Sequence, residues 1–157
     1  MKTKKIAAVL ASILTVVALS GCSLTRDVAS LDPYAPSDGV VSDIGDLKVR
    51  NLLIIKGEGD QGLLIGSFVN SSQTEVSGSI QLLDADSNRT TYDFTVAPLS
   101  KLDLGYGENA PLVLEVPEIP GSMHSIYISD GMNPRQLLVP VLDGSLAEYS
   151  AIAELLN

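Results

Sequence analysis

The sequence predicts an all-β domain, an antiparallel immunoglobulin-like β-sandwich of about seven or eight strands, followed by a short C-terminal helix. Three observations lead to this fold class. Short apolar stretches are separated by turn-forming residues, several of these stretches alternate between apolar and polar side chains, and no helical stretch between them could serve as a crossover connection. Because parallel strands need such connections, we expect antiparallel sheets.

The first predicted strands are continuous apolar stretches. Leu47 to Lys56 is rich in Val, Leu and Ile and ends at the Gly57-Glu-Gly-Asp60 cluster, and Leu63 to Asn70 is the next stretch. Turn residues of this kind punctuate strands because they adopt the backbone angles that a tight turn requires. We therefore expect two neighbouring strands here.

The clearest strand pattern runs from Glu75 to Leu83, where apolar or small residues alternate with polar ones. Alternate residues of a strand point to opposite faces, so one set should point inward. The expected inward set is Val76, Gly78, Ile80 and Leu82. Thr90 to Val96 alternates in the same way, and Asp84 to Asn88 should form the turn between the two strands.

The remaining elements complete the domain. Further strands are expected at Lys101–Gly105, Leu112–Val116, Met123–Ser129 and Gln136–Leu142. Ser145-Leu-Ala-Glu148 matches a capping box, with Ser145 as the N-cap of a helix. The residues expected on the apolar face of that helix are Tyr149, Ile152, Ala153 and Leu156.

The N-terminus has the features of an export signal. Three of the first five residues are lysines, and the run from Ile6 to Leu19 is uncharged and mostly apolar. A membrane-spanning helix needs about 20 apolar residues, so this run is short for a permanent anchor. Residues 1–21 are therefore predicted to be a signal peptide.

Leu19-Ser-Gly-Cys22 resembles the lipobox of bacterial lipoprotein precursors. The resemblance implies transfer of a diacylglyceryl group to the Cys22 thiol and cleavage between Gly21 and Cys22. Two or more acyl chains hold a protein firmly in a bilayer, whereas one binds only marginally. Cys22 is also the only cysteine, so no disulfide can form within the chain. We expect a lipid anchor at Cys22 on the extracytoplasmic face of the cell membrane.

The expected organisation follows from these boundaries. Residues 22–41, rich in Ser, Asp, Pro and Gly, should form the lipidated N-terminus and a flexible tether, 42–144 the β-sandwich, and 145–157 the short helix or tail. The region after Cys22 resembles small actinobacterial lipoproteins with an immunoglobulin-like domain of unknown role. The resemblance is carried by the segments Pro33–Gly39, Gly45–Asn51 and Val139–Val141.

The charge of the chain limits its partners. Removal of residues 1–21 would leave 136 residues with 7 basic and 19 acidic side chains, a net charge of −12. Nucleic-acid binding needs a positive surface that displaces phosphate counterions, so we expect no nucleic-acid partner. Anionic lipid headgroups would also repel the domain.

The sequence offers one candidate copper site. His124 is the only histidine, Met123 is adjacent to it, and Met132 follows eight residues later. Imidazole and thioether groups suit Cu(I), and periplasmic copper chaperones combine a small β-sandwich with such ligands. Their pattern has two histidines and a downstream His-x-Met element, both of which this chain lacks. An ordinary strand histidine and apolar methionines explain the same residues.

Two other kinds of site fit the sequence less well. Asp84-Ala-Asp86-Ser-Asn88 begins like a calcium loop, but Arg89 occupies the glycine position and Thr95 the position of the bidentate glutamate. A hairpin turn accounts for these residues. The chain has no nucleophile-elbow, zinc-type histidine or phosphate-loop motif, so we expect neither an enzyme nor a cofactor.

Together these features predict a membrane-anchored extracytoplasmic lipoprotein, a non-catalytic accessory or binding module with an envelope protein as its possible partner. The alternative is an extracytoplasmic copper-handling lipoprotein that uses His124, Met123 and Met132.

Overall fold

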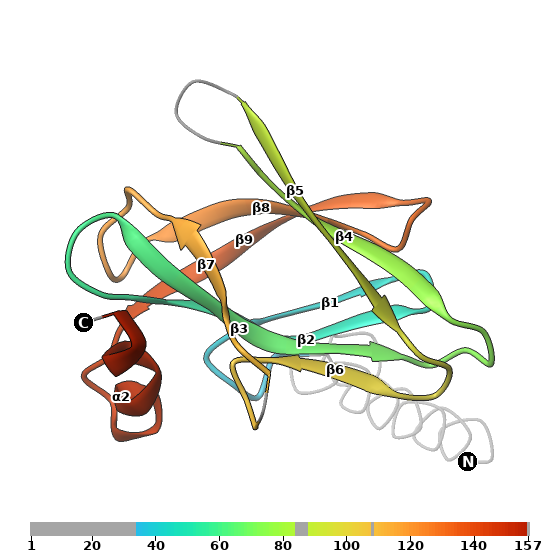
Figure 1. Cartoon of the computed structure of the whole chain (residues 1–157), viewed down its shortest axis with the longest axis horizontal. Helices are drawn as coiled ribbons and strands as arrows, with labels where there is room; N and C mark the ends of the chain where they lie inside the picture. The colour runs from blue at the N-terminus through green and yellow to red at the C-terminus, as the bar shows by residue number, and fades with distance from the viewer. Residues whose placement is uncertain (1–33, 84–87, 108, 157) are drawn as a thin grey trace, which may run out of the picture. The chain divides into compact units, whose positions relative to one another are not determined.

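A computed structural model of the chain describes residues 34–83, 88–107 and 109–156. All of the described elements belong to one compact unit, Ala35–Asn157 (Figure 1). They are β1 (Val40–Ile44), β2 (Leu47–Lys56), β3 (Gln61–Asn70), β4 (Val76–Leu83), β5 (Arg89–Val96), β6 (Lys101–Leu104), β7 (Leu112–Glu115), β8 (Met123–Ser129), β9 (Pro134–Asp143), helix α2 (Ala147–Ala153) and the 3-10 turn η2 (Glu154–Leu156). Among the described helices, none is long and apolar enough to cross a membrane.

The all-β prediction and eight strand positions are confirmed, with bounds that agree to within two residues. The alternation in β4 is confirmed as well, because Val76, Gly78 and Ile80 are buried while Ser77 is exposed. On β5, Val96 is buried and Tyr92 and Phe94 are half-buried between exposed neighbours. Alternation therefore identified the inward faces correctly.

The purely antiparallel sandwich is wrong, because the structure has one curled, mixed sheet. The strand order is β5-β4-β8-β9-β2-β3-β6, with β1 on β2 and β7 on β3. Most pairs are antiparallel, but Ile54, Ile55 and Lys56 of β2 pair in parallel with the last residues of β9. The whole chain between β2 and β9 serves as the connection that a parallel pair needs, so no crossover helix is required.

Strand β9 joins the two halves of the curled sheet. Its residues Pro134–Pro140 pair with β8, and Val141–Asp143 pair with β2. The sheet folds over one hydrophobic core, to which both halves contribute side chains. The largest fully buried members include Phe68, Leu47, Leu52, Ile54, Ile126 and Ile128. In Figure 1 the β4–β5 hairpin crosses β8 and β9 in projection and runs at an angle to β2 and β3, as expected for a curled sheet.

Strand β1 was not predicted, and its first two residues lie in the segment assigned to the tether. It pairs with β2 through a two-residue turn at Gly45 and Asp46, where Gly45 has φ +55°. Ser42 occupies an inward position of β1 and is buried. A serine at an inward position breaks the apolar alternation that would have revealed the strand. Residues 22–33 of the predicted tether lie outside the described part of the chain.

The short C-terminal helix is confirmed, but its predicted cap is wrong. Leu146 occupies the N-cap position, and no side chain caps the helix. The Ser145 N–H and hydroxyl instead donate to the Asp143 carboxylate, a local turn that competes with capping. As predicted, Tyr149 and Ile152 are buried. They pack with Ala153 and Leu156 on the second face of β2 and β3, in a cluster that also contains Leu53, Ile55, Leu63 and Ile65.

Candidate functional site

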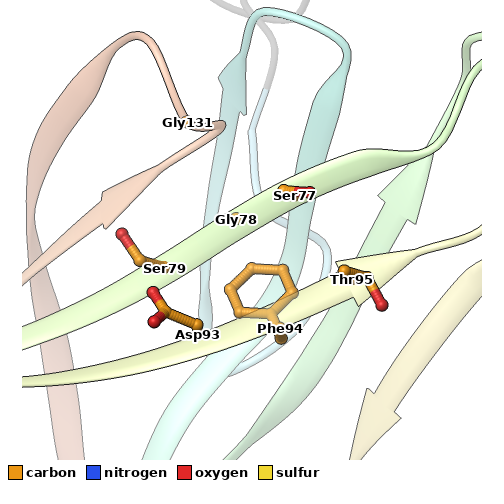
Figure 2. Close-up of a pocket in the computed structure, with 7 residues that line it drawn as sticks. All are labelled: Ser77, Gly78, Ser79, Asp93, Phe94, Thr95 and Gly131. Carbon is orange, nitrogen blue, oxygen red and sulfur yellow. The ribbon is translucent and has the colours of Figure 1, made fainter.

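A hollow of about 460 Å³ lies where β4, β5 and the β8–β9 turn meet (Figure 2). It is lined by Ser77, Gly78, Ser79, Asp93, Phe94, Thr95 and Gly131. Its volume is within the range of small-molecule sites, which combine an apolar surface with a few convergent polar groups. This hollow is the candidate functional site.

The register of β4 and β5 places the polar groups of the hollow in pairs. Ser77 is opposite Thr95, and Ser79 is opposite Asp93. Paired residues of an antiparallel sheet project from the same face, with Cβ atoms about 4.5–5.5 Å apart. Three hydroxyls and a carboxylate therefore project together from the outer face of the hairpin.

Gly78 and Phe94 form the middle pair of this site. A Cβ atom added at Gly78 would lie 2.5 Å from Cζ of the Phe94 ring, so only glycine leaves room for the ring in this position. Figure 2 shows the ring between the two strands. The ring also packs against Phe68, with centroids 4.6 Å apart, which fixes the aromatic group from the core side.

The polar side chains of the hollow are available to a ligand. Within the described part of the chain, Ser77, Ser79, Asp93 and Thr95 form no side-chain hydrogen bond or ion pair. Ser77, Asp93 and Thr95 are exposed, and Ser79 is half-buried. Each hydroxyl can donate one hydrogen bond and accept others, and the carboxylate accepts several. The site thus presents unused donors and acceptors side by side.

The β8–β9 turn fixes the third wall of the hollow. Gly131 has φ +91°, and an added Cβ would lie 2.8 Å from the Ser77 carbonyl oxygen, so the turn sits directly against β4. The Asp130 carboxylate accepts hydrogen bonds from the Met132 N–H at 3.0 Å and the Asn133 N–H at 2.7 Å. Partial burial by itself would raise the pKa of the Asp130 carboxyl. The hydrogen bonds from these N–H groups outweigh that effect, so the pKa is lowered.

A second hollow of about 390 Å³ adjoins the first and shares Ser77 and Gly131 with it. Its lining includes the acidic residues Asp46, Glu75 and Asp130. In the described ranges of the chain, no group of three histidine, cysteine or acidic side chains is placed to hold a metal ion. The Asp130 carboxylate accepts hydrogen bonds from its own turn. The second hollow is therefore an acidic margin of the first.

The predicted copper ligands are not brought together. Met123 and His124 are neighbours on β8 and point to opposite faces, with Met123 50% exposed and His124 5% exposed. Met132 is 83% exposed in the β8–β9 turn, beyond the far end of β8. His124 and Ser129, the last residue of β8, are separated by about 17 Å along the strand.

His124 belongs instead to a buried polar network. Its Nδ1 lies 2.8 Å from Oε2 of Glu118, and the Lys56 Nζ donates to the carbonyl oxygens of Val116 and Glu118 at 2.6 and 2.8 Å. Lys56 itself is only 8% exposed. A buried ammonium needs such hydrogen-bond acceptors. Through these two bonds, Lys56 links the end of β2 to the segment between β7 and β8.

The other predicted sites lie wholly or partly outside the described residues. Residues 84–87 of the possible calcium loop and the lipid-attachment residue Cys22 are among them. Sequence reasoning treated Ser77 and Ser79 as solvent-facing and assigned them no role. The signal that could have indicated the site is the run of hydroxyl side chains on the outer face of two strands joined by a turn.

No protein-family model matches the chain, and no curated protein matches it by sequence. Among solved structures, the chain is similar to one described as "Copper-bound PCuAC domain from PmoF2", with 13% sequence identity and a TM-score of 0.49. The match covers 66% of this chain and 98% of that one. The copper belongs to that domain, and at this identity no ligand residue is carried over to the present chain.

Proposed function

We propose that this protein is a membrane-anchored extracytoplasmic lipoprotein whose β-domain is a non-catalytic binding module. The sequence supports the anchor through the charged N-terminus, the short apolar run and the lipobox that ends at Cys22. Between Cys22 and β1 there are enough residues to hold the domain clear of the lipid headgroups, since 17 residues reach about 55 Å when extended and about 23 Å as a flexible coil.

The observation that carries the binding role is the hollow on β4 and β5. Four polar side chains project together there without internal partners, and three of them are exposed to solvent. The single histidine is engaged with Glu118, and it is not among the lining residues. The hydroxyls of the hollow therefore have no histidine beside them, and their arrangement is suited to holding a ligand.

The anchor is tested by expressing the full chain and its Cys22→Ala variant in a bacterial host with labelled palmitate. The wild type should incorporate label and sediment with membranes, and Cys22→Ala should incorporate none and should either remain as the unprocessed precursor or be released to the medium. Ser23→Ala, which leaves the lipobox unchanged, is the matched control and should behave like the wild type. Equal labelling of the wild type and Cys22→Ala would refute lipid attachment at Cys22.

Copper handling is the rival proposal, and its predicted ligands are His124, Met123 and Met132. The placement of these residues on opposite faces and beyond the end of β8 does not favour it. Equilibration of the purified protein with Cu(I) separates the two proposals. The binding-module proposal predicts the same copper uptake by the wild type and by His124→Ala, whereas stoichiometric binding that is lost in His124→Ala would support the rival.

A further inference from the structure

The hollow belongs to a sheet face whose charge differs from that of the rest of the protein. The outward positions of β5, β4, β8 and β9 include one acidic and one basic residue, Asp93 and Arg89, while the whole chain has 19 acidic and 10 basic residues. The face is therefore neutral overall. A neutral face on an acidic protein neither attracts basic partners nor repels uncharged ones.

Hydroxyl and amide groups continue from the hollow across the middle of this face, beside the exposed apolar side chains of Met123 and Leu138. Ser79 is opposite Ser129 of β8, and Gln81 is opposite Tyr127, which is in turn opposite Gln136 of β9. The Gln136 Nε2 donates to the Ser125 hydroxyl at 2.7 Å, which holds the amide in place. Tyr127 adds a half-buried aromatic ring near the centre of the face.

The size of the face limits its occupant. Four strands spaced about 4.8 Å apart and about 23 Å long cover an area of about 450 Å². A stable protein interface buries about 800 Å² on each partner, so the face is small for a protein partner. It is large enough for a chain of several small rings.

We infer that the hollow and the adjoining face bind a neutral, hydroxyl-rich polymer, that is, an uncharged glycan. This inference rests on the proposed binding module and names the ligand class of its site. The hydroxyls of Ser77, Ser79 and Thr95 exchange hydrogen bonds with sugar hydroxyls, and the Asp93 carboxylate accepts from them. The Tyr127 ring, on the same outer face, contacts the apolar face of a sugar ring. The acidic margin around Asp130 excludes acidic glycans.

The test uses the full chain, purified in detergent, and measures binding by titration calorimetry and saturation-transfer NMR. The probes are maltohexaose, cellohexaose and mannohexaose as neutral glycans, a galacturonate hexamer as an acidic glycan, and hexa-arginine as a basic peptide. At least one neutral hexamer should bind at millimolar concentration with little dependence on salt, and the galacturonate hexamer should not bind.

Two variants locate the site and identify its chemistry. Combined Ser79→Ala and Asp93→Ala should weaken binding of the neutral glycan at least tenfold, since both groups lose their hydrogen bonds. Asp93→Asn, which keeps a hydrogen-bonding side chain without the charge, should stay within about threefold of the wild type. Glu148→Gln on the exposed face of α2 is the matched control and should have no effect.

Three results would overturn the inference. These are no binding of any neutral hexamer at millimolar concentration, binding unaffected by the double variant, or binding of hexa-arginine that is lost in Asp93→Asn and at high salt. Each of these leaves the lipid anchor untouched, because membrane attachment is measured separately through Cys22→Ala. Loss of the anchor with intact glycan binding would refute the proposed location alone.

Discussion

Ile80 and Ser79 are adjacent on β4 and should have opposite roles in the protein. Ile80 is 2% exposed and packs in the core between the two halves of the sheet, whereas Ser79 projects from the outer face into the hollow. Ile80→Ala is therefore a test of packing. Ser79→Ala, one residue away on the same strand, is its matched control.

The expected loss for Ile80→Ala follows from the atoms removed. Truncation beyond Cβ removes buried carbon worth about 0.8 kcal/mol per group, or about 2.4 kcal/mol in transfer free energy. The cavity left behind raises the total to about 3 kcal/mol, within the range of about 2–5 kcal/mol seen for such changes. With a urea dependence of about 1.5 kcal/mol/M, the unfolding midpoint should fall by about 2 M.

Urea unfolding followed by far-ultraviolet circular dichroism measures both variants. Ser79→Ala should leave the free energy of unfolding within about 0.5 kcal/mol of the wild type, because its side chain has no partner in the described part of the chain. Equal midpoints for the two variants would refute the face assignment. A larger loss for Ser79→Ala would show that the register of β4 is shifted by one residue.

Three further substitutions test other contacts by thermal or urea unfolding. Gly78→Ala should lower the free energy of unfolding by about 1–3 kcal/mol, because its new Cβ would meet the Phe94 ring; an unchanged melting temperature would contradict this close approach. Lys56→Met should cost about 1–3 kcal/mol by leaving two carbonyl oxygens without their donor, and a gain in stability would show that the ammonium is not needed. Burial and the Asp38 carboxylate raise the pKa of Tyr149 in the folded protein. Above about pH 10 this tyrosine therefore ionises in the unfolded chain before it ionises in the folded protein, and the free energy of unfolding should fall as the pH rises. Tyr149→Phe should reduce that alkaline fall in a series of urea titrations, and an unaltered slope would show that Tyr149 does not contribute to it.

Local patterns were sufficient to locate most strands, because one buried face imposes a period of two on the sequence. β4 shows this clearly, since its inward residues could be assigned from alternation alone. β1 was not predicted because a polar residue, Ser42, occupies one of its inward positions. The parallel pairing of β2 with β9 joins residues almost ninety positions apart, and no local pattern encodes the pairing of such distant strands.

The candidate site could not be predicted from the sequence for a related reason. Ser79 and Asp93 could each be placed on an outer face, but their alignment depends on the register of the hairpin. The third wall, Gly131, comes from a turn more than fifty residues away from Ser77. The proposed copper ligands show the converse error, because Met123 and His124 are adjacent in the sequence yet point to opposite faces of the sheet.

The central claim, a lipid-anchored binding module, is tested most directly by the mass of the protein extracted from membranes. Intact and peptide mass spectrometry should show a chain that begins at Cys22 and carries a diacylglyceryl group on that residue. The N-terminal peptide should lack residues 1–21 entirely. A membrane-extracted chain that keeps these residues, or one with a free Cys22 thiol, would contradict the account.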